Sequence, residues 1–442
     1  MITINKGLDV PITGEPSEQI TEHSPRHVAI VGYDYIGMKP TMNVKVGDTV
    51  AKGQPVYTDK KRAGVIYTAP ASGKVVAINR GERRVFESLV IEIDNQSTES
   101  SNNEVTFNHY NSNELANLDP QTVEEQLNQA GEWTSLRTRP FSRTPELGSR
   151  PSAIFVTAMD TNPLAMNPAR LIKEEQQAFN DGLAVLSTLT PKTYVCYHGD
   201  AELVRVEHTA VDNKTEYHAF KGVHPAGNAG THIHFLHPVS RHVTVWTIGY
   251  QDVIAIGKLF TTGKVYTKRW ISLAGPAVKE PRIIVTERGA DITELVDGEL
   301  KAPETQAGST KQGVHRVISG SVLSGRKADP SVAYLGRFHN QVSVLQEGYE
   351  RPSFHFFTLG LNRFSKMPIY LSQFFGGKKF NFTTSSNGSP RAMVPIGAFE
   401  KVMPQDYLPT QLLKSLIVED IVQAVELGVI LRDNLTRIEM EG

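Results

Sequence analysis

Histidine residues gather in one stretch of this sequence, and imidazole is a common ligand for metal ions. Six of the 14 histidines lie within 25 residues: His218, His224, His232, His234, His237 and His242. His232 and His234 are separated by one residue, so a strand would place both side chains on the same face, as a metal site requires. Few carboxylates lie nearby in the sequence, and we therefore favour a structural role over a metal site.

A glycine-containing loop overlaps this histidine stretch. Residues His224 to Gly230 have the sequence HPAGNAG. Glycines before a helix let the backbone approach a phosphate group closely. The loop lacks the G-x-G-x-x-G pattern of dinucleotide sites, because Asn228 stands at the place of the second glycine. We favour an architectural loop, with a nucleotide site as the alternative.

Two apolar loops contain the residue types that anchor ligands and partners. Residues Glu132 to Phe141 (EWTSLRTRPF) place two large aromatic side chains on either side of two arginines. Loops at domain junctions are frequent binding sites, and aromatic residues and arginine are common interface anchors. Tyr33, Tyr35, Ile36 and Met38 form a second such loop. The predicted ligand or partner contacts are Trp133, Arg137, Arg139, Phe141, Tyr35 and Met38, with packing between domains or barrel closure as the alternative.

The sequence gives little support for hydrolytic catalysis or for cysteine-based sites. No Ser–His–Asp, paired-carboxylate or Cys–His arrangement can be recovered from residue spacing. The single cysteine, Cys196, excludes intrachain disulfides, cysteine-rich zinc sites and protein-held iron–sulfur clusters, and it suits a reducing compartment. Cys196 lies in the apolar run Thr193 to Tyr197, so we expect a buried, unreactive thiol.

The bulk composition narrows the class of protein. The chain has 442 residues, a net charge of −1 and a pI near 6.9, so it lacks the basic surplus of nucleic-acid-binding proteins. No apolar run approaches the 18 or so residues that cross a bilayer. The N-terminal residues resemble a strand rather than the apolar core of a signal peptide. We expect a cytoplasmic protein, or one docked on the cytoplasmic side of a membrane.

The elements that position these residues begin with a β-rich domain over residues 1–95. Valines at positions 44, 46, 50 and 56 alternate with Gly-Asp and Gly-Gln turns, which predicts a small barrel or sandwich. The segment Gly37 to Val76 resembles the barrel-sandwich domain of biotinyl and lipoyl carriers. Arg62 stands where those carriers attach their cofactor to lysine. A structural use of the barrel is favoured, and a shifted linkage at Lys61, next to Lys60, is the alternative.

Four further regions follow. Residues 96–150 form a linker with a polar loop at 96–103, a short helix from Thr122 as N-cap to Gly131, and the junction loop. Residues 151–265 predict a Rossmann-like α/β domain, with strands at 153–157, 194–197, 232–236 and 244–248 and helices at 171–189 and 253–260.

Residues 266–350 predict a β-grasp (SLBB-like) domain, with a short helix capped by Asp291 or Thr293 and a mobile loop at 303–313. Residues 351–442 form a C-terminal region with amphipathic helices. Their apolar positions recur at three- and four-residue spacing: Leu412, Leu413, Leu416, Ile417, Ile421 and Val425.

Several uncommon sequence runs occur in a fixed order, and together they carry a family resemblance. The runs are INKGLD at 4–9, GMKPTM at 37–42, TRPFS at 138–142, VTAMDTNPL at 156–164, HPAG at 224–227, GTHIHF at 230–235, SLAGP at 272–276 and ISGSVLSG at 318–325. In this order they resemble the A subunits of Na+-translocating NADH:quinone reductases over almost the whole chain. One departure is that these subunits usually carry a two-cysteine stretch where Gly428 is followed directly by Val429 here.

The resemblance implies one of six subunits of a bacterial respiratory sodium pump. Such a polypeptide is peripheral, has no transmembrane helix, and lies on the cytoplasmic face of the inner membrane against the membrane-embedded B subunit and the flavoprotein C subunit. The complex is an NADH:ubiquinone reductase that exports Na+. Its FMN, FAD, riboflavin and iron–sulfur centres would be on other subunits, and the isolated chain is not expected to be catalytic.

The family is also distantly similar to the RnfC subunit and to the FMN-binding subunit of complex I. In those relatives a loop of the form G-x-G-G-A-x-F-P-T holds the flavin phosphate. Ser135, Arg137 and Thr138 fill the glycine positions here, so the flavin site is expected to be lost.

The resemblance therefore implies a cofactor-free subunit that supports quinone binding and complex assembly. The alternatives are an RnfC-like electron-transfer subunit that binds flavin or NADH, and a docking module without a ligand. The aromatic residues and arginines of the junction loop would provide the flat apolar wall and the hydrogen-bond donors that a quinone needs.

Overall fold

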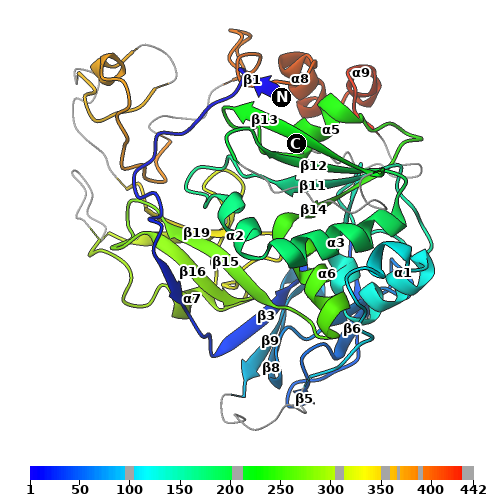
Figure 1. Cartoon of the computed structure of the whole chain (residues 1–442). Helices are drawn as coiled ribbons and strands as arrows, with labels where there is room; N and C mark the ends of the chain where they lie inside the picture. The colour runs from blue at the N-terminus through cyan, green and yellow to red at the C-terminus, as the bar shows by residue number, and fades with distance from the viewer. Residues whose placement is uncertain are drawn as a thin grey trace.

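The computed structural model describes residues 1–94, 104–201, 213–303, 313–349, 359–365, 369–386 and 392–430. It confirms a mixed α/β chain with a barrel-sandwich domain, a central α/β domain and a β-grasp domain (Figure 1). The predicted polar loop at 96–103 and most of the loop predicted at 303–313 lie outside the described residues.

The barrel-sandwich domain consists of two small antiparallel sheets. One sheet has the order β3 (His27–Val31), β9 (Phe86–Ile93), β8 (Gly73–Arg80), β5 (Thr49–Val50), and the other β4 (Pro40–Met42), β6 (Pro55–Asp59), β7 (Ile66–Thr68). Side chains alternate along each strand, so one face of each sheet reaches the core. Val50 and Val56 are buried there, while Val46 is exposed in a turn.

The hairpin tip between β6 and β7 is held in place. The Arg62 guanidinium donates from Nε to the Thr144 carbonyl at 3.2 Å and lies 3.3 Å from the Glu146 carboxylate. Lys60 and Lys61 are exposed beside it. The tip that carries a cofactor on a swinging arm in biotinyl and lipoyl carriers is therefore fixed to the junction segment in this chain.

The first residues of the chain join two other domains. β1 (Ile2–Ile4) pairs in parallel with β13 (Thr215–Gly222) of the α/β domain, and β2 (Ile20–Glu22) pairs in parallel with β16 (Arg282–Glu287) of the β-grasp domain. These two strands were predicted to belong to the barrel domain. The hydrophobic pattern of three-residue strands does not identify their partners, because pairing depends on distant sequence.

The α/β domain is built on a six-stranded sheet with the order β1-β13-β12-β11-β14-β10. The central strands β12 (Thr193–His198), β11 (Ile154–Ala158) and β14 (Val245–Gly249) are parallel, and β10 (Arg137–Arg139), from the predicted linker, pairs antiparallel with β14. Helices α2 (Pro168–Glu174), α3 (Gln176–Leu189) and α6 (Tyr250–Thr262) cover one face, and α5 (Ala229–Leu236) packs on the other (Figure 1).

Three sequence predictions in this part of the chain were wrong. Residues 232–236 belong to helix α5 rather than to a strand, because the helix begins at the Asn228 cap and buries only one side. The helix predicted over 171–189 is interrupted at Glu175. Helix α1 (Pro120–Gln129) is capped by Asp119, whose carboxylate accepts from the Gln121 and Thr122 amides, so Thr122 is not its cap.

The β-grasp domain contains a six-stranded mixed sheet with the order β18-β17-β19-β15-β16-β2. Its other strands are β15 (Lys268–Ala274), β17 (His315–Ser319), β18 (Arg326–Lys327) and β19 (Gln341–Gln346). Helix α7 (Ile292–Leu295) packs its apolar side on the sheet. Asp291 caps this helix by accepting from the Thr293 and Glu294 amides. Of the two predicted caps, Asp291 and Thr293, Asp291 is therefore the correct one.

The C-terminal region has the predicted amphipathic character in two short helices, α8 (Pro409–Ile417) and α9 (Ile421–Glu426). Short 3-10 helices complete the fold: η1 (Gly32–Asp34), η2 (Glu82–Arg84), η3 (Leu115–Asn117), η4 (Glu132–Ser135) and η6 (Leu371–Phe374).

A buried cluster of charged side chains joins the domains. We call it the charge network: Glu132, Asp252, Arg269, Arg288 and Arg337. Glu132 accepts from Arg288 at 2.6 Å and from Arg337 at 3.1 Å, and Asp252 accepts from Arg337 at 2.5 Å and from Arg269. Burial alone would raise the pKa of Asp252, but Arg269 and Arg337 hold the pKa at about 2. Glu132 comes from the junction, Asp252 from α6, and the arginines from the β-grasp domain.

Replacing one carboxylate of the charge network should destabilise the whole chain. Asp252→Asn leaves two buried guanidiniums without their shared counter-charge, and we expect a loss of roughly 3–5 kcal/mol in the free energy of unfolding. Because the pKa of Asp252 is depressed, its stabilisation is complete above about pH 4 and is lost as pH falls towards 2. Urea unfolding at pH 7 measures this change.

Glu18→Gln is the matched control, since it breaks an ion pair with Arg170 in which the glutamate side chain is 83% exposed. Its expected effect is below about 1 kcal/mol. Equal effects of the two variants would contradict a stabilising function of the charge network.

Candidate functional site

An open cleft of about 1140 Å³ lies in the described part of the chain. It lies beyond the carboxyl ends of β11 and β14, since Thr157, Met159, Asp160 and residues 247–252 form its floor. From β11 the chain proceeds to β12 on one side of the sheet, while β14 lies on the other side. Ligands of open α/β sheets bind at such a switch point of the strand order.

Several parts of the chain contribute to the walls of the cleft, including Leu8 and Val10 of the N-terminal segment. The junction supplies Ser135, Arg137 and Arg139, and the β-grasp domain supplies Leu323, Ser324, Arg337, Phe338 and Asn340. The loop before α5 and the helix itself supply His224, Pro225, residues 227–231, Ile233 and His234. The C-terminal region closes the outer side with residues 402–405, Tyr407, Val425 and 428–430.

The two predicted arginines reach the cleft because β10 extends the α/β sheet. Arg137 pairs with Thr247 of β14, and Arg139 pairs with Val245. The Arg137 guanidinium stacks on the Phe338 ring at 4.3 Å from its centroid, a favourable cation–π distance. Tyr35 meets the same ring edge to face at 6.2 Å. The structure thus brings two predicted contact residues, Arg137 and Tyr35, together through Phe338, which the sequence analysis missed.

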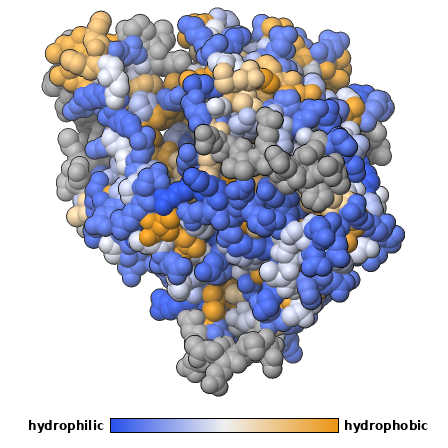
Figure 2. Space-filling view, viewed as in Figure 1, coloured by the Kyte–Doolittle hydropathy of each residue, from blue (hydrophilic) through white to orange (hydrophobic). Residues whose placement is uncertain are grey.

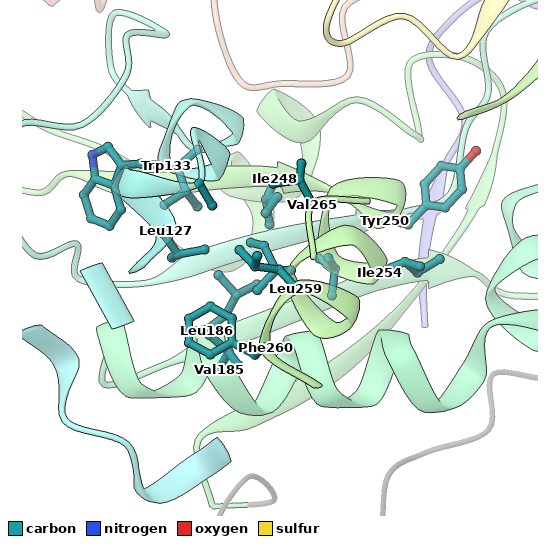
Figure 3. Close-up of a cluster of buried hydrophobic side chains, with 14 of the residues drawn as sticks. Leu127, Trp133, Val185, Leu186, Ile248, Tyr250, Ile254, Leu259, Phe260 and Val265 are labelled. Carbon is teal, nitrogen blue, oxygen red and sulfur yellow. The ribbon is translucent and has the colours of Figure 1, made fainter. Parts of the chain in front are cut away.

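Trp133 has a different environment from the one predicted. Its side chain is fully buried, donates from Nε1 to the Pro145 carbonyl at 3.0 Å, and packs edge to face on Trp246. Figure 3 shows it within the cluster of buried hydrophobic side chains around helix α6. No ligand or partner can reach Trp133 without disrupting this core. The alternative of inter-domain packing is therefore the correct one for this residue.

Two other predicted residues lie away from the cleft. Phe141 is half-buried after the β10 strand, in a left-handed backbone conformation with φ of 77°. Met38 lines a separate hollow of about 10 Å³ with Arg62 and Arg143. Neither residue is among those that line the cleft, so Arg137 and Arg139 are the predicted contact residues that do line it.

The histidine pair does not form a metal site. Because residues 229–236 are helical, His232 and His234 point in different directions. His232 is buried and shares a hydrogen bond of 2.9 Å with the Ala226 carbonyl, and burial lowers its pKa to about 4. His234 lies against the Tyr407 ring at 5.6 Å. Among the described residues, the group of metal-ligand type that does come together is His27, Asp291 and Glu294, which is remote from these histidines in sequence.

The glycine-containing loop packs closely against a neighbouring turn of the α/β domain. The Gly227 amide donates to the Thr161 hydroxyl at 2.9 Å, and His224 Nδ1 lies 3.1 Å from the same oxygen. A Cβ atom at Gly227 would approach the Thr161 amide nitrogen to 2.7 Å. The glycine is therefore required for close packing of the loop against the turn after β11, which itself lines the cleft.

Asp160 is a second cleft residue that the sequence analysis missed as a site. It lies two residues after the end of β11, within the run VTAMDTNPL. Its Oδ1 accepts from the Asn162 amide and from Asn162 Nδ2, both at 2.8 Å. Burial raises the pKa of Asp160, although these two hydrogen bonds oppose the shift. The position of a polar residue at the end of a buried strand was the signal available in the sequence.

Cys196 is buried in β12, and burial raises its pKa well above the usual range. The prediction of an unreactive thiol is confirmed.

Comparison with known proteins agrees with this architecture. Family models match three consecutive parts of the chain: the NqrA N-terminal barrel-sandwich hybrid domain over residues 2–94, the NqrA second alpha/beta domain over 118–265, and the NqrA C-terminal (SLBB) domain over 270–329. The Na(+)-translocating NADH-quinone reductase A subunit of Saccharophagus degradans is 55% identical, with all of both chains covered.

The chain belongs to the NqrA family. Relatives of the same name from Alcanivorax borkumensis and Teredinibacter turnerae are 50% and 51% identical over the whole of both chains. The alignment with the Saccharophagus NqrA relative spans 468 positions against 442 residues here, so at least 26 positions have no residue in this chain. A solved NAD+-reducing [NiFe]-hydrogenase matches 52% of the chain at 12% identity with a TM-score of 0.32, which is too low to establish a shared fold.

Substitution of Trp133 tests its assignment to the core. Trp133→Ala removes a fully buried indole and its hydrogen bond, and we expect a loss of about 3–5 kcal/mol in the free energy of unfolding. Trp133→Phe should lose less, because the ring remains. Urea unfolding followed by circular dichroism measures both. A change in the free energy of unfolding below about 1 kcal/mol for the alanine variant would contradict the assignment of Trp133 to the core.

Proposed function

We propose that this chain is the peripheral NqrA component of a bacterial Na+-translocating NADH:quinone reductase, on the cytoplasmic face of the inner membrane. It would assemble with the membrane components of the complex, among them the B and C subunits, and contribute to quinone binding. The FMN, FAD, riboflavin and iron–sulfur centres would reside on other subunits. Support comes from the full-length similarity to NqrA proteins and from one surface of the chain.

That surface carries the proposal, and we call it the apolar end. Of 22 large hydrophobic side chains exposed in the described residues, 14 lie between residues 359 and 422. They are Leu359, Leu361, Ile369, Leu371, Phe374, Phe375, Val394, Ile396, Tyr407, Leu408, Ile417, Val418, Ile421 and Val422. The segments that carry them run along the top of Figure 1, opposite the barrel-sandwich domain, and orange patches mark the same region in Figure 2.

The exposed side chains of the apolar end would be stabilised by burial against a partner. Phe374 is 83% exposed and Val422 is 73% exposed, although each side chain gains roughly 1.5–3 kcal/mol when buried. Contiguous apolar surfaces on soluble domains mark interaction sites. Within the described residues no helix has the length and apolar character of a membrane span. An apolar end that docks on membrane subunits explains both observations.

The cleft supports the second part of the proposal. Phe338 offers a flat apolar wall, and Arg137 and Arg139 offer guanidinium donors for carbonyl oxygens. Ser135 and Arg137, which fill glycine positions of the flavin loop in distant relatives, line the same cleft. Side chains at these positions replace the glycines that let a backbone approach a flavin phosphate closely, which favours an uncharged ring such as a quinone over the alternative of flavin.

Polar substitutions on the apolar end should weaken assembly. The triple variant Ile417→Ser, Val418→Ser, Val422→Ser removes three exposed apolar side chains from the α8–α9 segment, and we expect at least a tenfold lower recovery with a tagged B subunit from membranes. Val46→Ser with Val85→Ser is the control, since these valines are 56% and 49% exposed on the barrel. Equal recovery for the two variants would refute docking through the apolar end.

Substitution in the cleft should weaken quinone binding by the isolated chain. Phe338→Ala removes the wall and the stacking partner of Arg137, and we expect about tenfold weaker binding of a soluble short-chain ubiquinone. Intrinsic tryptophan fluorescence of the full chain follows the titration. Phe141→Ala is the control because Phe141 does not line the cleft. A wild-type chain that shows no saturable binding would leave docking as the function of this protein.

A further inference from the structure

One carboxyl group in the floor of the cleft has hydrogen bonds to only one of its two oxygens. Asp160 Oδ1 receives both Asn162 hydrogen bonds, which close an Asx-type turn after β11. Asp160 Oδ2 has no hydrogen-bond partner among the described residues, and Asp160 lines the cleft. The turn therefore fixes the orientation of the carboxyl group while it leaves one oxygen available to a ligand.

Within the described ranges, the surroundings of Asp160 provide no counter-charge in hydrogen-bond contact. Tyr250, at the start of α6, faces the cleft, and burial followed by the charge of Asp160 raises its pKa. His224, on the loop before α5, lies against Thr161, and burial lowers its pKa. Asp252 and Arg337 also line the cleft, but they are paired within the charge network.

An unpaired carboxylate in such a place disfavours a second negative charge. A phosphate or carboxylate group that entered the floor of the cleft would be repelled by ionised Asp160. A neutral ligand carries no net charge to be repelled, and its carbonyl oxygen would accept a hydrogen bond from the protonated carboxyl group, whereas the ionised carboxylate would face that oxygen as a second acceptor. The floor of the cleft therefore discriminates between ligand classes by charge.

We propose that Asp160 is the specificity-determining residue of the cleft, with Oδ2 donating a hydrogen bond to a carbonyl oxygen of an uncharged ring ligand. This inference rests on the proposed quinone contact at Arg137 and Phe338. Asp160 would hold one polar end of the ring from the sheet side, while the ring face contacts Phe338. Burial of the carboxyl group by the ligand stabilises the protonated form further.

Because Asp160 must be protonated to donate, the proposal predicts how ligand affinity changes with pH. The protonated group is the donor, so binding should be tightest at acid pH and weaken as pH rises through the raised pKa of Asp160. Asp160→Asn retains the Oδ1 acceptor of the turn and replaces Oδ2 with an amide donor that cannot ionise. This variant therefore keeps the hydrogen bonds of the turn while it removes the titration of the group that binds the ligand.

The experiment titrates the full chain with a soluble short-chain ubiquinone between pH 4.5 and pH 9, followed by tryptophan fluorescence. For the wild type we expect the dissociation constant to rise at least tenfold across this range. For Asp160→Asn we expect a dissociation constant that stays within threefold of the acid-side value. Asp160→Ala should bind weakly at every pH, and thermal unfolding verifies that each variant is folded.

Glu125→Gln is the matched control, because it removes one carboxylate from the exposed surface of α1 and should keep the pH dependence of the wild type. The same pH dependence in Asp160→Asn and in the wild type would overturn the function of Asp160 while leaving the quinone contact in place. Absence of saturable wild-type binding at every pH would instead overturn the quinone contact, and this inference with it. Inorganic phosphate that competes with the quinone would contradict the discrimination by charge.

Discussion

The arrangement of the domains depends on a buried set of opposite charges. Three guanidiniums and two carboxylates lie at the point where the junction, α6 and the β-grasp domain meet. Ionised groups removed from water are costly unless each has a partner, so the domains cannot separate without exposing or unpairing them. The barrel is attached to the same point, since Asp34 accepts from the Arg337 amide at 2.8 Å and from the Arg326 guanidinium at 2.7 Å.

This constraint also determines the shape of the cleft. Asp252 and Arg337 both line it, and both are locked by the charge network. Phe338 follows Arg337 directly in sequence, so the ring on which Arg137 stacks is fixed relative to α6. The walls of the site are therefore rigid where the domains meet. The outer side is formed by residues 402–405 and Tyr407 and by α9 and the residues after it, which lie outside the charge network.

Sequence periodicity and turn chemistry were sufficient for much of the fold. The short apolar runs of β11, β12 and β14 and the apolar segment of α6 gave correct elements, because local patterns determine them. The His232 segment was wrong because one buried side of a short helix resembles an apolar strand. Trp133 was misplaced because aromatic residues serve equally in cores and in interfaces, and only tertiary packing distinguishes the two. Arg137 was found, whereas Phe338 and Asp160 required knowledge of which distant loops meet.

The pairing of β1 and β2 with distant strands has a consequence for synthesis on the ribosome. The barrel strands between residues 27 and 93 are complete early and can pair with one another as soon as they emerge. β2 must wait for β16, which follows about 260 residues later, or roughly 10–50 seconds at bacterial elongation rates. During that interval the first strands of the chain have unpaired edges. Nascent chains of this protein are therefore expected to need chaperone protection at the N-terminus until the β-grasp domain has been translated.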